Sequence, residues 1–125
     1  MYSRTVLVVD DEPLIRMLLM EALEDEGFHV LEASNVLEAV VVFGTHDIDA
    51  LVTDVDMPGP LNGFDLVDLV AKRGRRIAIV ITSGRHLGGD RVLPSSSKFL
   101  PKPYLVSEVL EALAEVAPIE TSLAS

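Results

Sequence analysis

The sequence predicts one α/β domain built on a five-stranded parallel sheet with helices on both faces. Apolar runs of strand length alternate along the chain with stretches of helical periodicity, which is the pattern of repeated β–α–β units. The runs are continuously apolar, as expected for strands that are covered on both sides. Polar residues follow several runs directly. These observations predict a doubly wound sheet whose functional side chains lie at the carboxyl ends of its strands.

The length and composition of the chain make several classes of function unsuitable. The 125 residues suffice for one domain with its own core, since 49% of them are hydrophobic. A formal charge of −10 disfavours nucleic acid and membranes as partners. The absence of cysteine excludes a thiol nucleophile. Because no apolar run reaches about 20 residues and the start does not resemble a signal peptide, we expect a cytoplasmic protein.

The first half of the chain contains two predicted strands, at 5–9 and 28–31. Between them, Pro13 opens a helix that ends at Gly27. A second helix is expected over 35–44, because Asn35 and Glu38 have the spacing of a capping box. The first helix should bury one stripe of apolar residues, namely Ile15, Leu18, Leu19 and Ala22.

The second half contains three predicted strands, at 50–54, 77–81 and 98–100. Pro58 and Gly59 close the first of them. A helix is expected over 64–72, with Leu66, Leu69 and Val70 inward. The last helix should begin near Ser107 and place Val109, Leu110, Leu113 and Val116 on one side.

Two stretches depart from this regular pattern. The interval from Gly84 to Ser97 should supply a helix, but its glycines, proline and serines predict a short, distorted or mobile one. Residues 118–125 are expected to form a flexible tail after a domain that spans residues 1–117.

Charged and hydroxyl side chains follow the predicted strands at what should be one edge of the sheet. They are Asp10, Asp11, Asp54, Thr82 and Lys102. Three crowded carboxylates repel one another unless a cation joins them, and oxygen ligands without His or Cys suit Mg²⁺. A carboxylate beside Mg²⁺, an ammonium and a hydroxyl could accept a phosphoryl group as an aspartyl phosphate.

Four segments in this order, VLVVDDEP, LVTDVDMPG, IVITSG and FLPKPY, resemble the receiver domain of two-component response regulators over about residues 5–116. The resemblance implies a flavodoxin-like sheet order of 2-1-3-4-5. It also implies that Asp54 is the phosphoacceptor and that Thr82 and Lys102 bind phosphoryl oxygens. Phe99 would be a switch residue together with Thr82, and the bond from Lys102 to Pro103 would be cis.

The resemblance further implies a site for Mg²⁺, or Mn²⁺, made of Asp10, Asp11, Asp54 and the backbone carbonyl of Asp56. In this reading Asp11 is a direct ligand. The protein would be a stand-alone switch, not an enzyme acting on other substrates. It would take its phosphoryl group from a histidine kinase or a histidine phosphotransfer protein. Its output would be binding to a downstream protein, and the switch itself would be a monomer or a weak homodimer.

Other interpretations stay open for these residues. Taken singly, Asp10 and Asp11 could favour a helix dipole, Lys102 could be a surface lysine, and Phe99 could be core. A receiver-like module that binds partners without phosphorylation is one rival function. An aspartate-nucleophile phosphatase of the haloacid dehalogenase type is another, because Asp54-Val55-Asp56 resembles its paired acids.

The sequence also departs from the usual receiver pattern. The loop over residues 59–62 looks one residue longer than usual. Asp56 adds an acid beside the phosphorylation site, and we expect its side chain to alter dephosphorylation. The irregular 84–97 interval falls where receivers commonly carry part of their output surface.

Overall fold

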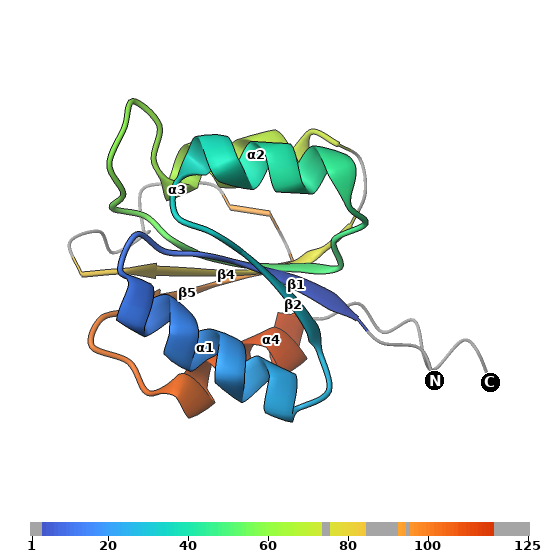
Figure 1. Ribbon diagram of the computed structural model, residues 1–125, viewed down its shortest axis with the longest axis vertical. Helices are drawn as coiled ribbons and strands as arrows, with labels where there is room; N and C mark the ends of the chain where they lie inside the picture. The colour runs from blue at the N-terminus through green and yellow to red at the C-terminus, as the bar shows by residue number, and fades with distance from the viewer. Residues whose placement is uncertain (1–3, 74–75, 85–92, 95, 117–125) are drawn as a thin grey trace.

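The computed structural model describes residues 4–73, 76–84, 93–94 and 96–116. It contains one parallel sheet of five strands in the order β2-β1-β3-β4-β5, as predicted (Figure 1). In chain order the elements are β1 (Thr5–Val9), α1 (Pro13–Asp25), β2 (His29–Ala33), α2 (Val36–Thr45), β3 (Ala50–Asp54), α3 (Gly63–Ala71), β4 (Ala78–Ser83), β5 (Ser97–Pro101) and α4 (Val106–Val116).

Helices cover both faces of the sheet. In Figure 1, α1 and α4 lie on one face and α2 and α3 on the other. Every residue of β3 and β4 is buried, which explains why these strands are continuously apolar until their last residues. Each face has its own core: Leu7, Leu51 and Ile79 point toward α2 and α3, whereas Val8, Val52 and Val80 point toward α1 and α4.

The ends of α1 are where the sequence predicts them. Pro13 is the first helical residue, and Gly27 after the helix has a φ of +96°, which a side chain would disfavour. The buried stripe is Leu19 and Leu23, and the prediction that Leu18 is inward is wrong, because Leu18 is 45% exposed. Leu18 lies about 100° around the helix from Leu19 and so borders the groove between α1 and the segment before α4.

The N-terminus of α2 differs in detail from the predicted capping box. Asn35 Oδ1 accepts a hydrogen bond from Glu38 N at 2.9 Å, as expected. The Glu38 carboxylate, however, accepts from Ser34 N and Ser34 Oγ, each at 2.8 Å. These hydrogen bonds still satisfy backbone N–H groups at the start of α2. The Glu38 carboxylate, however, bonds to Ser34 and not to the N-cap residue Asn35, as a capping box would require.

A complete capping box, which the sequence analysis missed, begins α3. Asn62 Oδ1 accepts from Asp65 N at 3.1 Å, and Asp65 Oδ2 accepts from Asn62 N at 2.7 Å. The helix buries Val67 fully and leaves Leu69 43% exposed, so the predicted inward position of Leu69 is wrong. Apolar residues occupy both sides of α3, so helical periodicity alone does not show which side is buried.

The start of α3 is pressed against the end of β3. Gly63 N donates to Val55 O at 2.9 Å. A Cβ atom at Gly63 would lie 2.2 Å from Asp54 O, a separation that real side chains do not show. This contact sets the position of the backbone that carries Asp54.

Strands β1 and β3 have the predicted bounds, and the other boundaries differ from the predictions by one or two residues. The last helix is α4, which buries Val109, Ala112 and Leu113. The predicted irregular helix falls largely on residues 85–92 and 95, which lie outside the described residues, as does the tail over 118–125. Within the described ranges, no helix has the length and apolar character to cross a membrane.

Candidate functional site

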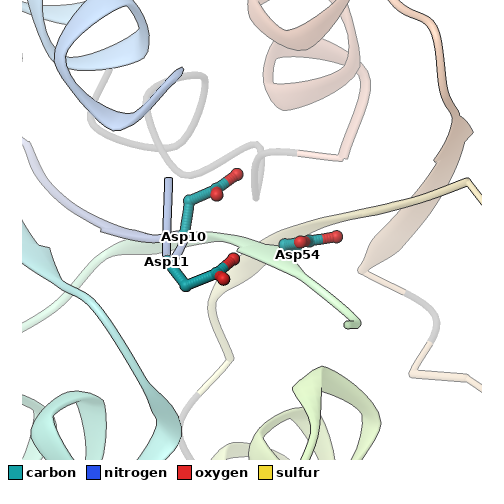
Figure 2. A group of neighbouring side chains, drawn as sticks. All are labelled: Asp10, Asp11 and Asp54. Carbon is teal, nitrogen blue, oxygen red and sulfur yellow. The ribbon is translucent and has the colours of Figure 1, made fainter. Parts of the chain in front are cut away.

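Three carboxylates meet at the carboxyl ends of two adjacent strands, β1 and β3. Asp10 and Asp11 follow β1, and Asp54 is the last residue of β3, which pairs with β1 in parallel register. Each residue offers a carboxylate oxygen, and these atoms all lie within 4.8 Å of one another. Figure 2 shows Asp10, Asp11 and Asp54 projecting from neighbouring chain segments into the same region. The predicted cluster is therefore formed.

Asp10 is held in place by the turn into α1. Its side chain is buried, and its Oδ1 accepts a hydrogen bond from Glu12 N at 2.9 Å. The backbone is held as well, because Arg16 Nη1 donates to Asp10 O at 2.7 Å. Arg16 also pairs with Glu32 on β2 at 2.7 Å. Asp11, in contrast, is exposed.

Asp54 is buried beside a lysine. The side chain of Asp54 is 4% exposed, and Lys102 Nζ lies 3.2 Å from its Oδ1. Asp54 Oδ1 is buried, forms this ion pair, and has no hydrogen-bond partner among the described residues. Lys102 N donates to Ser83 O at 2.8 Å, which positions the lysine after β5. The bond from Lys102 to Pro103 is cis, as predicted.

Burial and repulsion from neighbouring acids disfavour the charged forms of Asp10 and Asp54. Desolvation, with repulsion from Asp54 and Asp11, raises the pKa of Asp10 to about 6. Desolvation also raises the pKa of Asp54, although Lys102 opposes the shift. Burial lowers the pKa of Lys102, but attraction to Asp54 and Asp10 outweighs it and leaves that pKa above its usual value. The cluster thus carries more negative charge than its neighbours neutralise.

The donor set fits a hard divalent cation. The cluster supplies carboxylate oxygens and no nitrogen or sulfur, which suits Mg²⁺ or Mn²⁺. Asp54 contributes one carboxylate oxygen to this group, and its buried Oδ1 atom has no hydrogen-bond partner among the described residues. Asp56, two residues beyond β3, is exposed, and its Oδ2 accepts from Ser83 Oγ at 3.4 Å.

Thr82 lies on β4, which is next to β3, and Phe99 lies on β5, on the far side of β4. Thr82 is buried on β4 and pairs in register with Asp54, while Val55 N donates to Thr82 O at 2.9 Å. Phe99 is half-buried on β5, pairs in register with Ile81, and packs against the core on the α2 and α3 face. Thr82 therefore lies beside Asp54, whereas β4 separates Phe99 from the strand that carries Asp54.

Four further residues shape the site and were not singled out from the sequence. Gly63 contacts the Asp54 backbone, Arg16 holds the Asp10 carbonyl, and Ser83 reaches Asp56. The hydroxyl of Tyr104 is buried without a hydrogen-bond partner among the described residues. Burial and repulsion from Asp10 and Asp54 raise the pKa of Tyr104 to about 12. Only Ser83, beside Thr82, had a signal in the sequence, since it directly continues the polar end of a buried strand.

Comparison with solved structures gives close agreement in fold. A response regulator receiver protein from Sinorhizobium medicae superposes with a TM-score of 0.83 at 25% identity, covering 91% of this chain and 94% of that one. Response regulator protein TrrA from Thermotoga maritima, solved in complex with Mg(2+)-BeF, superposes with a TM-score of 0.79 at 27% identity. That match covers 90% of this chain and 98% of TrrA.

Sequence relatives agree with the structural ones. Response regulator GtcR of Aneurinibacillus migulanus is 31% identical over 117 residues, which are 91% of this chain and 46% of GtcR. Chemotaxis protein CheY of Thermotoga maritima is 29% identical over 119 residues, covering 92% of this chain and 98% of that protein. This chain thus spans less than half the length of GtcR.

The response regulator receiver domain model matches residues 6–114, which include every strand end described above. The acidic cluster after β1 and β3 lies inside that match. The chain belongs to the response regulator receiver domain family of two-component systems.

Proposed function

We propose that the protein is a phosphorylation-controlled switch in which Asp54 accepts a phosphoryl group. The observation that carries the proposal is the buried Asp54 Oδ1 atom, which lies 3.2 Å from Lys102 Nζ and has no hydrogen-bond partner among the described residues. A carboxylate oxygen beside an ammonium group that can neutralise phosphoryl oxygens is suited to attack phosphorus. The acid cluster next to it would hold the cation that phosphoryl transfer requires.

The donor would be a phosphohistidine of a histidine kinase or histidine phosphotransfer protein. Asp54 attacks the phosphorus atom, the new P–O bond replaces the P–N bond, and the imidazole leaves with the bonding electron pair and takes a proton from solvent. Asp10, Asp11, Asp54 and the backbone carbonyl of Asp56 would hold Mg²⁺ or Mn²⁺. When bound, the cation neutralises charge on the phosphoryl oxygens.

Lys102 and Thr82 would bind the remaining phosphoryl oxygens, since Thr82 pairs in register with Asp54 and Lys102 Nζ lies 3.2 Å from Asp54 Oδ1. Thr82 is buried, so reaching the phosphoryl group requires its side chain to turn toward Asp54. Phe99, half-buried on the adjacent strand, would take up the space released. Phosphorylation would then shift the balance between two arrangements of β4 and β5.

A phosphorylation-controlled switch needs a protein that supplies its phosphoryl group and a protein that it binds as output. Segments similar to this chain occur within autoinducer sensor kinase/phosphatase LuxN of Vibrio harveyi, at 34% identity, and within sensory/regulatory protein RpfC of Xanthomonas campestris, at 28%. Segments that resemble this chain thus form parts of larger sensor proteins. For this chain we propose a cytoplasmic receiver domain over residues 1–117, with a tail over 118–125, whose output is binding to a downstream protein.

Intact-mass analysis after incubation with Mg²⁺ and acetyl phosphate tests the proposal. The wild type should gain the mass of one phosphoryl group, and Asp54→Asn should gain none. Asp68→Asn, which changes an exposed acid on α3, is the matched control and should be modified like the wild type. A wild-type protein that gains no mass would favour a module that binds without phosphorylation. Modification of Asp54→Asn to the same extent would place the acceptor elsewhere.

A further inference from the structure

The turn from β1 into α1, which carries Asp10 and Asp11, is fastened to the neighbouring strand β2. Asp10 N donates a hydrogen bond to Ala33 O on β2 at 3.2 Å. Asp10 O accepts from Arg16 Nη1 at 2.7 Å, and Arg16 Nε donates to Glu32 Oε1 on β2, also at 2.7 Å. Both backbone polar groups of Asp10 are thus tied to β2, one directly and one through a guanidinium group.

The two contacts of Arg16 hold its side chain in one orientation. The Arg16 side chain is 17% exposed, whereas that of Glu32 is 51% exposed. Because a guanidinium group is planar, one bond through Nε and another through Nη1 fix the plane in which it lies. Hydrogen bonds from a charged donor are also shorter and stronger than neutral ones. Arg16 is therefore a rigid bridge between β2 and the Asp10 carbonyl, unlike an arginine in a solvated surface ion pair.

This bridge restricts where the Asp11 carboxylate can lie. Asp10 O belongs to the planar peptide unit that joins Asp10 to Asp11, so fixing this oxygen also fixes the direction in which the chain enters Asp11. Asp11 is exposed, and no hydrogen bond among the described residues holds its side chain. One of its carboxylate oxygens nevertheless lies within 4.8 Å of those of Asp10 and Asp54. The backbone, which Arg16 holds, therefore keeps Asp11 in the cluster.

We propose that Arg16, supported by Glu32, is a positioning residue that sets the affinity of the acidic cluster for its cation. The inference rests on the cation site of the proposed function. Arg16 has no acceptor atom on its side chain and contributes no ligand, so it acts through the peptide between Asp10 and Asp11. Without the bridge this peptide turns more freely, and Asp11 is less often at the ligand position. Removing a group that orients a metal ligand typically lowers affinity about 10- to 100-fold.

Electrostatics alone predicts the opposite change. Arg16 is a positive charge beside a cluster of acids, so its removal would make the surroundings of the cluster more negative and strengthen cation binding. Positioning predicts instead that removal weakens binding. The sign of the change in affinity therefore separates the two effects.

Binding of Mn²⁺ to the full chain tests the proposal without a phosphoryl donor, because electron paramagnetic resonance measures the free ion. Arg16→Met removes the donors and the charge, and should raise the dissociation constant for Mn²⁺ at least about tenfold. Arg16→Lys keeps the charge but not the planar fork, and should raise it by less. Glu32→Gln should weaken binding in the wild-type background and change it little in an Arg16→Met background, because Glu32 acts through Arg16.

Two variants are the controls. Arg73→Met removes an exposed arginine after α3, which lies over the ring of Phe43, and tests the effect of net charge. Ile48→Val shortens a buried side chain before β3, at the end of that strand opposite Asp54, and should lower stability. Both should bind Mn²⁺ like the wild type. Urea unfolding of every variant in EDTA shows how far its stability has changed.

Four outcomes would overturn the proposal. Tighter binding by Arg16→Met would show that charge outweighs position. Equal weakening by Ile48→Val and Arg16→Met would show that affinity follows stability alone. If the wild type and Arg16→Met bind Mn²⁺ equally, the cation site stands and only the role of Arg16 is refuted. A wild type that binds no Mn²⁺ would refute the cation site and the role of Arg16 together.

Discussion

Replacing Asp10 by Asn should stabilise the metal-free protein at neutral pH. Asp10 is buried, and burial together with repulsion from Asp54 and Asp11 raises its pKa from 3.8 to about 6. A shift of roughly two units corresponds to about 3 kcal/mol of unfavourable free energy when the group is ionised. The amide keeps the oxygen that accepts from Glu12 N and removes the charge. The 3 kcal/mol is an upper value, because the native state relaxes around the charge.

The sign of the pH dependence follows from proton binding. Between pH 3.8 and about 6 the folded protein holds a proton on Asp10 that the unfolded chain has released. Wild-type stability should therefore fall as pH rises through this window, and the destabilisation should be complete above it. Asp10→Asn lacks this dependence. Its advantage over the wild type should be largest near neutral pH and should disappear below the pKa of the unfolded chain.

Urea unfolding in EDTA at pH 7.5 and near pH 4 measures both effects. The transition midpoint of Asp10→Asn should exceed that of the wild type at pH 7.5, with converging values near pH 4. Added Mg²⁺ should stabilise the wild type more than the variant, because the wild type has the full acid cluster. Asp68→Asn should change stability by less than about 0.5 kcal/mol at either pH. An equal advantage of Asp10→Asn at both pH values would refute the electrostatic origin.

Three other substitutions test the surroundings of Asp54. Gly63→Ala should destabilise the fold by about 1–3 kcal/mol in urea unfolding, because the added Cβ would overlap Asp54 O. It should also slow phosphorylation. Unchanged stability of this variant would contradict the close approach of Gly63 to Asp54. Asn62→Ala should cost about 1 kcal/mol through loss of the α3 cap, whereas Asn62→Asp should retain most of the stability. Asp56→Asn should phosphorylate faster with acetyl phosphate, since it removes a negative charge from the approach of an anion, and should change the lifetime of the phosphorylated form. Equal rates and lifetimes for wild type and Asp56→Asn would show that this carboxylate has no influence on the site.

The strands were the most predictable part of the fold. Strands β1, β3 and β4 are short runs of mainly apolar residues, and the run of β3 ends in Asp54 and is followed closely by Pro58 and Gly59. Burial on both faces makes every position of such a strand apolar, so its limits are visible in the sequence to within a residue or two. The polar residues that follow then fall at one edge of a parallel sheet. That is why the cluster of Asp10, Asp11 and Asp54 could be predicted without coordinates.

The orientation of the helices was less predictable. Leu18 and Leu69 were expected inward and are outward, while Leu23 and Val67 are the buried residues. When a helix has apolar residues on two sides, several rotations about its axis would each place apolar residues against the sheet. The sheet and the neighbouring helices select one of them through packing. Local sequence does not contain that information.

By itself, the sequence determined the order of elements, the strand ends and the chemistry gathered there, because these depend on the polarity of successive residues. The tertiary structure decided the rest of the site. It buries Asp54 Oδ1, which has no hydrogen-bond partner among the described residues, places Lys102 Nζ 3.2 Å from that atom, and packs Gly63 against the strand that carries Asp54. It also leaves Leu37 and Val41 of α2 exposed. These properties arise from contacts between segments far apart in the chain, so they follow from packing and not from any local pattern.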